Sequence, residues 1–184
     1  MNWTLIIILA VVVIAVLYVI SVRNSLVVLK NKVEDQKSQI DIQLKRRFDL
    51  IPNLVETVKG YAKHEKETLE GVVNARNTYL SAGTQEDQLK ADGELTKAIN
   101  KLFALTESYP DLKANENFLG LQAELSETEE KITYARQFYS DSVLQYNNKI
   151  DLFPSNIVAS LFGYKKEKFF EATDAEKENV KVKF

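Results

Sequence analysis

The chain opens with a continuous apolar stretch. Residues 5–20 read LIIILAVVVIAVLYVI, and the first charged side chain after it is that of Arg23. From Trp3 to Val22 the stretch holds about 20 residues, which span about 30 Å as a helix and match the hydrocarbon core of a bilayer. We therefore predict that residues 1–22 form a transmembrane anchor and that the lipid bilayer is a binding partner.

A cleaved signal peptide is the alternative interpretation of this stretch. Signal peptides carry a basic segment before the apolar core and small residues at a cleavage site after it. Neither feature is present around residues 5–20, and the absence of cysteine excludes lipoprotein attachment. The first basic residues, Arg23, Lys30 and Lys32, follow the stretch. By the positive-inside rule we expect an uncleaved single-pass protein of the cell membrane, with its N-terminus outside and its body in the cytoplasm.

Beyond the anchor, apolar residues recur every three or four positions, as in amphipathic helices. We expect a first helix that continues to about residue 50 and ends at Pro52, because proline breaks or kinks a helix. A second helix begins at Pro52 and ends at residues 81–84, and a third spans residues 86–108. The fourth, over residues 115–150, has a 3-4-3-4 apolar spacing that is typical of helices packed at shallow angles.

These patterns predict an all-α protein. We expect the anchor to be followed by an elongated antiparallel four-helix bundle over residues 23–150, with a coiled-coil-like seam along its fourth helix. Residues 151–164 then form a short helix, either against the membrane or as a cap on the bundle. Aromatic and basic residues suited to the interface are Trp3, Tyr18, Arg23, Phe153, Leu161, Phe162, Lys165 and Lys166.

Residues 165–184 form a charged tail that ends in an alternation of apolar residues and lysine. Such alternation is typical of a strand that adds to a partner, whereas a solvated terminus is the commoner fate of charged chain ends. We expect Phe169 and Phe170 to pack against the body. We expect the last residues, with Val180, Val182 and Phe184, to become ordered only with a protein partner.

The formal net charge of the whole chain is −2, which argues against nucleic acid as a partner. Acidic side chains gather between residues 107 and 130, where Lys113 is the lone basic residue. Glu124, Glu127 and Glu130 are candidates for contacts with a basic protein partner, although solvated helix faces produce similar clusters.

Two stretches resemble each other, ARNTY at residues 75–79 and ARQFY at residues 135–139. Arg76 and Arg136 occupy matching places in them. The two arginines either present their guanidinium groups to a shared partner, or pair with carboxylates on a neighbouring helix that the adjacent alanines allow to approach closely.

Three blocks of sequence carry a family resemblance. They are QLKRRFDLIPNLV at residues 43–55 with VKGYAKHE at residues 58–65, YPDLKAN at residues 109–115, and the Glu-x-x-Ile-x-x-Ala-Arg-x-x-Tyr pattern at residues 129–139. Together they resemble the bacterial LemA family over nearly the whole chain, with a departure at Ser140, where the family usually has asparagine. The resemblance implies a single-pass protein with a short external N-terminus and a four-helix domain, and together with the seam it suggests a homo-oligomer.

Catalytic chemistry has little support in the sequence. Cysteine is absent and His64 is the single histidine, so Cys–His catalysis and clustered histidine metal sites are excluded. We predict no cofactor, no metal site and no enzymatic activity. The expected function is that of a membrane-anchored scaffold or adaptor in the cell envelope, and the alternative is a regulatory or hydrolytic factor of envelope maintenance with an unrecognised site.

Overall fold

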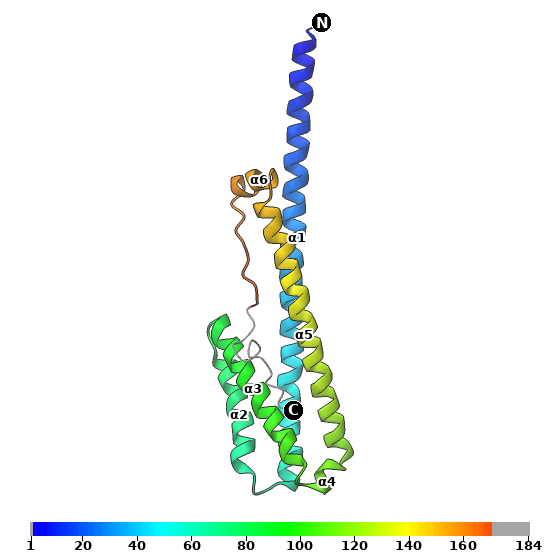
Figure 1. Cartoon of the computed structure of the whole chain (residues 1–184), viewed down its shortest axis with the longest axis vertical. Coiled ribbons are helices and arrows are strands. Elements are labelled where there is room, and N and C mark those ends of the chain that lie inside the picture. Colours follow the sequence, from blue (N-terminus) through cyan, green and yellow to red (C-terminus); the bar gives the residue numbers. More distant parts are fainter. Residues whose placement is uncertain (1, 171–184) are drawn as a thin grey trace, which may run out of the picture. The chain divides into compact units, whose positions relative to one another are not determined.

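The computed structural model describes residues 2–170, without the side chains of residues 85 and 86, and over this range it contains helices and no strand. The prediction of an all-α protein is therefore confirmed (Figure 1). The six helices are α1 (Trp3–Tyr61), α2 (Lys66–Ser81), α3 (Gln85–Thr106), α4 (Pro110–Lys113), α5 (Glu116–Asp151) and α6 (Ser155–Leu161). The described residues form two compact units.

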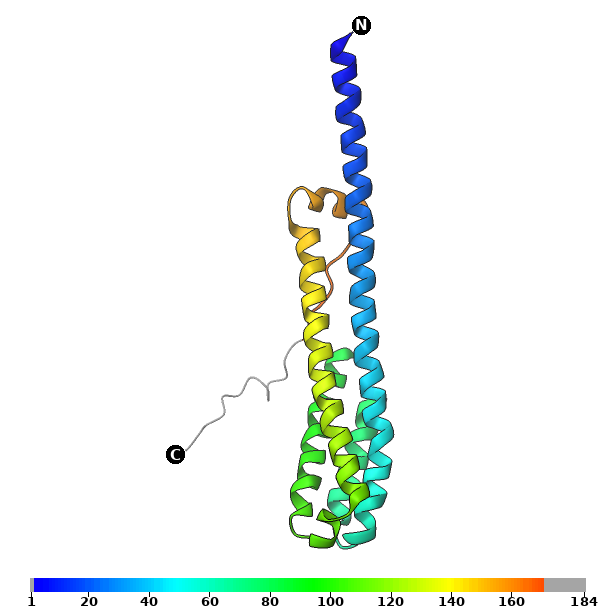
Figure 2. The same ribbon diagram turned by 90° about the vertical axis from the view of Figure 1, so that its right-hand side faces the viewer.

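The first unit contains residues 2–41 and 133–170. Here α1 and α5 run side by side, and α6 lies beside α1 (Figure 2). The side chain of Lys32 on α1 donates a hydrogen bond to that of Gln145 on α5 at 3.2 Å. Buried apolar side chains from the three helices form the core of this unit: Val22, Leu26, Val33, Ile40, Ala135, Tyr139, Val143, Tyr146, Val158 and Ala159.

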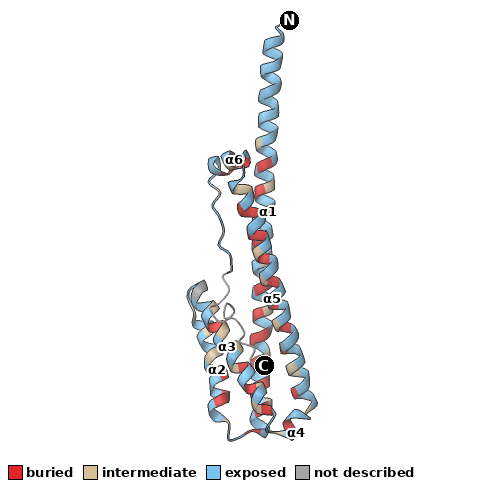
Figure 3. Ribbon diagram, viewed as in Figure 1, coloured by how far each residue is buried: buried red, intermediate tan, exposed pale blue. Residues whose placement is uncertain are grey.

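The apolar stretch at the start of α1 lies outside this core. Nearly all of its side chains are exposed, as the pale blue beginning of α1 shows in Figure 3. This part of the helix is long enough and apolar enough to cross a membrane. Burial on α1 begins at Val22, directly after the apolar stretch.

The second unit contains residues 42–132, in which the end of α1 and the beginning of α5 pack with α2, α3 and α4. The ring of Phe48 of α1 packs at a tilt against that of Tyr79 of α2, 4.5 Å between centroids, and Phe103 of α3 meets Phe118 of α5 edge-on at 6.2 Å. These ring contacts join the four longer helical segments in pairs across the core.

The predicted helix break at Pro52 is wrong, because α1 continues through Pro52 to Tyr61. A proline inside a helix has no N–H to offer the carbonyl four residues earlier, which here belongs to Phe48. Arg76 of α2 supplies the missing donor, since its Nε lies 3.2 Å from the Phe48 carbonyl oxygen. The turn to α2 instead occupies residues 62–65.

Two hydrogen bonds tie that turn to the chain around α4. The Tyr109 hydroxyl donates to the Glu65 carboxylate at 3.0 Å, and the Asn115 amide donates to the Tyr61 hydroxyl at 2.9 Å. The Asn115 side-chain oxygen also accepts from the backbone N–H of Phe118, which caps the start of α5. Pro110 stands in the first turn of α4, where its missing N–H costs nothing.

The positions of the seam predicted along α5 lie on the buried side of the helix. Leu121 and Lys149 are half-buried and its other members are buried: Phe118, Leu125, Thr128, Ile132, Ala135, Tyr139, Ser142 and Tyr146. The two small hydroxyl residues in the seam donate to carbonyls of their own helix, Thr128 to Glu124 at 2.7 Å and Ser142 to Phe138 at 2.8 Å. Small polar residues therefore fit a buried seam without a partner from another helix.

Candidate functional site

The short helix α6 has two chemically different sides. Ser155, Val158 and Ala159 are buried in the first unit. The opposite side is apolar but exposed, and together with the preceding turn it presents Leu152, Phe153, Ile157 and Leu161, each of which keeps more than 60% of its surface accessible. A helix that packs one apolar side and leaves another open to solvent marks a contact surface.

A cation–π contact joins α6 to the end of the apolar stretch. The Arg23 guanidinium lies over the ring of Phe162, 5.5 Å from its centroid. The other residues that the sequence suggested for a membrane interface are also accessible: Trp3, Tyr18, Phe153, Leu161, Lys165 and Lys166. Lys166 forms an ion pair with Asp151 at 2.7 Å.

Beyond α6, an extended segment of residues 165–170 lies along α5 in the first unit. Asn147 of α5 clamps its backbone: the side-chain amide donates to the Glu167 carbonyl at 2.9 Å, and the side-chain oxygen accepts from the Glu167 N–H at 3.0 Å. The Tyr139 hydroxyl donates to the Lys168 carbonyl at 3.0 Å. An asparagine side chain thus pairs with the segment as a neighbouring strand pairs in a sheet.

The end of this segment is held by aromatic contacts. The ring of Phe170 meets that of Tyr139 edge-on at 5.2 Å, and the Arg136 guanidinium lies 5.6 Å from the centre of the Phe170 ring. Phe170 therefore packs as expected, whereas Phe169 remains 45% exposed, contrary to expectation. Val180, Val182 and Phe184 lie outside the described residues.

Two tyrosines beside the segment have perturbed acidities. Burial, and then the negative charge of Glu167, raises the pKa of Tyr139. The same two causes raise the pKa of Tyr146, with smaller contributions from Tyr164 and Glu34. Both hydroxyls therefore stay protonated to a higher pH than a free tyrosine does.

Of the acidic candidates, Glu124, Glu127 and Glu130 are all exposed on α5 in the second unit. Glu127 forms an ion pair with Lys131 one turn away, and the hydrogen bond from Lys131 lowers the pKa of the Glu127 carboxyl. The positive charge of Lys131 therefore offsets part of the negative charge of the predicted acidic cluster.

The two similar arginines have different surroundings. Arg76 donates to the Phe48 carbonyl in the second unit, and Arg136 contacts the Phe170 ring in the first. Each of these contacts is made within the chain.

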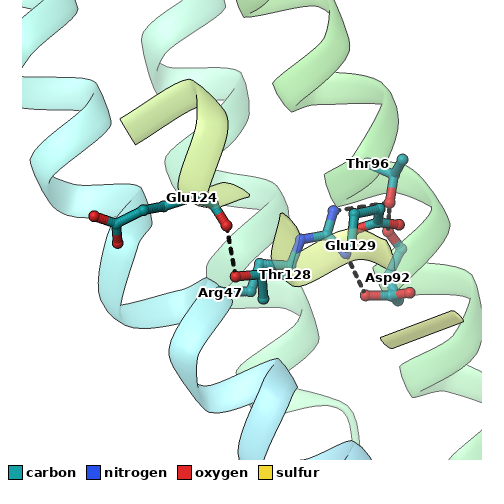
Figure 4. A network of polar contacts seen from close by, with 6 residues as sticks. All are labelled: Arg47, Asp92, Thr96, Glu124, Thr128 and Glu129. Atoms are coloured by element: carbon teal, nitrogen blue, oxygen red, sulfur yellow. Dashed lines mark hydrogen bonds and ion pairs between the residues drawn. The ribbon is translucent and has the colours of Figure 1, made fainter. Parts of the chain in front are cut away.

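A buried ionic cluster in the second unit had no counterpart in the sequence analysis (Figure 4). Arg47 of α1, only 2% exposed, forms ion pairs at 3.0 Å with Asp92 of α3 and with Glu129 of α5. Its other terminal nitrogen donates to the Thr96 hydroxyl at 2.8 Å. Asp92 is buried too, whereas Glu129 is 41% exposed. The cluster therefore links three helices in the core through one guanidinium group.

The spacing of α1 contained a signal for this cluster. Leu26, Val33 and Ile40 are buried at intervals of seven residues, and the next two positions in that series are Arg47 and Leu54. An arginine at a position of this buried apolar series is itself expected to be buried, and a buried guanidinium group needs acidic partners on the neighbouring helices.

Groups that hold a metal ion are absent from the described part of the chain, in which no three His, Cys, Asp or Glu side chains converge for that purpose. His64 lies in the turn after α1 and is exposed.

Together, the fold and these surfaces define a class: an all-α protein whose first helix carries a stretch able to cross a membrane. A model of the LemA family matches residues 36–184, and the chain belongs to that family. The resemblance noted in the sequence is thereby confirmed.

Individual relatives are distant in sequence. Protein LemA of Metamycoplasma hominis is 28% identical, over 86% of this chain and 73% of that protein. Magnetosome protein MamQ 1 of Paramagnetospirillum magneticum is 23% identical, and magnetosome protein MamQ of Magnetospirillum gryphiswaldense is 21% identical. Both comparisons cover 83% of this chain, which spans only 65% of the length of either MamQ protein.

Proposed function

We propose that this chain is a membrane-anchored helical scaffold or adaptor that holds protein partners, or further copies of itself, at the cell membrane. The observation that carries the proposal is the exposed apolar stretch at the start of α1, which continues without a break into a helix that packs in the protein body. An apolar helix surface of this length is stable in lipid and not in water. The body follows the anchor through one unbroken helix rather than through a linker.

The proposed orientation places the N-terminus outside and the helical body in the cytoplasm. The basic residues Arg23, Lys30 and Lys32 on the body side of the stretch support it. Since the chain has no cysteine, single cysteines can report the orientation directly. We expect a membrane-impermeant maleimide to label Asn2→Cys in intact cells, and to label Ser38→Cys only after the cells are lysed.

The scaffold role is tested by cross-linking and co-purification of the full chain from membranes. Specific partners, or further copies of the chain, are expected in the cross-linked product. A chain that stays in the soluble fraction, or that yields no cross-linked product at any expression level, would contradict the proposal.

A further inference from the structure

The outer side of α6 and the turn before it expose large apolar side chains. Phe153 is 79% exposed and Leu161 is 74% exposed, and Leu152 and Ile157 are 63% and 61% exposed. The inner side is packed, since Val158 and Ala159 are buried. The inner side of α6 therefore packs in the first unit, whereas its apolar outer side is not buried by that unit.

The position of this surface in the first unit is fixed by contacts at the end of the apolar stretch. Arg23 lies one residue beyond Val22, the first buried residue of α1, and its guanidinium covers the ring of Phe162 directly after α6. The backbone N–H of Tyr164 bonds to the Ala159 carbonyl at 3.0 Å and turns the chain back at Gly163, whose φ of +71° suits glycine. α6 thus lies beside α1 at the end of the stretch proposed to enter the membrane (Figure 2).

The flanking charges favour a lipid headgroup region. Lys149, Lys165, Lys166 and Lys168 flank α6, against the two carboxylates of Asp151 and Glu167. Asp151 pairs with Lys166, which leaves the remaining lysines in excess over the acidic groups. Exposed aromatic and aliphatic side chains flanked by lysines are the composition of helices that lie in the membrane interface.

We propose that Leu152, Phe153, Ile157 and Leu161 insert into the interfacial layer of the same bilayer that α1 crosses, with the flanking lysines among the headgroups. This inference rests on the proposed membrane anchor. Insertion of α6 would add a second lipid contact to the one made by α1. Since α6 is packed on one side of α1, that side must then face the bilayer surface, which fixes both the rotation of α1 about its axis and its depth.

The test uses the full chain in bilayers that contain a fraction of anionic lipid and lipids brominated at shallow or deep acyl positions. Single cysteines at Val12, Phe153 and Phe138 each carry the same environment-sensitive fluorophore. Phe138, also exposed in the first unit, lies 13 residues before the end of α5, about 20 Å along the helix, and is the matched control.

We expect deep bromines to quench the label at Val12 most strongly, shallow bromines to quench the label at Phe153, and neither to quench the label at Phe138. In the Ile157→Ser/Leu161→Ser variant we expect the shallow quenching at Phe153 to be lost while the quenching at Val12 persists. Quenching at Val12 without quenching at Phe153 overturns the inference and leaves the anchor intact. An unquenched label at Val12 overturns the anchor itself, and with it the proposed function.

Discussion

Arg47 links the helices of the second unit, since its single guanidinium group on α1 contacts both α3 and α5. Buried ion pairs recover little net stability over apolar packing, but removing one partner leaves the other charge in a low-dielectric core. Because Asp92 is buried, loss of the Arg47 charge destabilises the Asp92 carboxylate more than the accessible carboxylate of Glu129.

We predict that Arg47→Ala lowers the free energy of unfolding by about 3–5 kcal/mol, measured by urea denaturation of the detergent-solubilised chain. The neighbouring Arg46 is exposed, so Arg46→Ala is the control and is expected to change stability by less than about 0.5 kcal/mol. In the Arg47→Leu/Asp92→Leu double variant most of the stability returns. Equal stability of the two alanine variants would show that the cluster is dispensable.

Asn147 holds the extended segment through the two backbone groups of Glu167. We predict that Asn147→Ala removes about 1–3 kcal/mol of local stability, the net value of two hydrogen bonds. Hydrogen exchange is the measurement: protection of the Glu167 amide disappears while that of the α5 backbone persists. Asn148→Ala, at the exposed neighbouring position, is expected to leave the segment protected.

The tyrosines beside this segment predict a pH dependence. Burial and Glu167 raise the pKa of Tyr139 and Tyr146 in the folded state, so their contribution to stability is complete below the ordinary tyrosine pKa of about 10 and is lost as the pH rises through the folded-state values. We expect tyrosinate absorbance to develop in two stages, with these tyrosines in the later one. In Glu167→Gln the later stage moves to lower pH; an unmoved curve would exclude the electrostatic contribution.

At the scale of elements, the regular helical periodicity was predictable from the sequence. Residues that break the pattern but are stabilised by partners on other helices were not predictable. The seam of α5 follows from its 3-4 spacing because each position depends on the helix alone. Pro52 looks like a boundary in the sequence, and the donor that keeps it inside α1 comes from Arg76, 24 residues later. Arg47 likewise looks like a surface residue until its partners on α3 and α5 are known. The short helix α6 was predicted, but the sequence did not decide whether it packs against the body or against the membrane.

The Pro52 contact predicts a coupled pair. Arg76→Ala removes the donor to the Phe48 carbonyl and is expected to cost about 1 kcal/mol. In a Pro52→Ala background the new alanine N–H can serve that carbonyl, so the same substitution costs less. A double-mutant cycle from chemical denaturation measures the difference. Strictly additive effects would mean that Arg76 contributes through its packing alone.

At the scale of the whole molecule, self-association requires an accessible surface on the body. Tyr134 and Phe138 stand one helical turn apart on α5 and are both exposed, so they form an aromatic pair that a second copy can cover. We predict that light scattering of the solubilised chain shows a mass that rises with concentration, and that Phe138→Ser reduces it. Leu80→Ser, at an exposed leucine of α2, is the control. A monomer at every concentration would contradict this prediction.

Trp3 is the single tryptophan of the chain, and it stands exposed at the beginning of the apolar stretch, outside the buried cores. Its emission therefore reports the polarity around one end of α1 and carries no information on whether the helical body is folded. A blue shift on transfer from detergent to lipid measures insertion alone, and a fluorescence melting curve will look flat while the core around Arg47 unfolds. Tryptophan-fluorescence studies of folding in this protein need a second tryptophan, for which Phe118, 1% exposed and in edge contact with Phe103, offers a buried aromatic site.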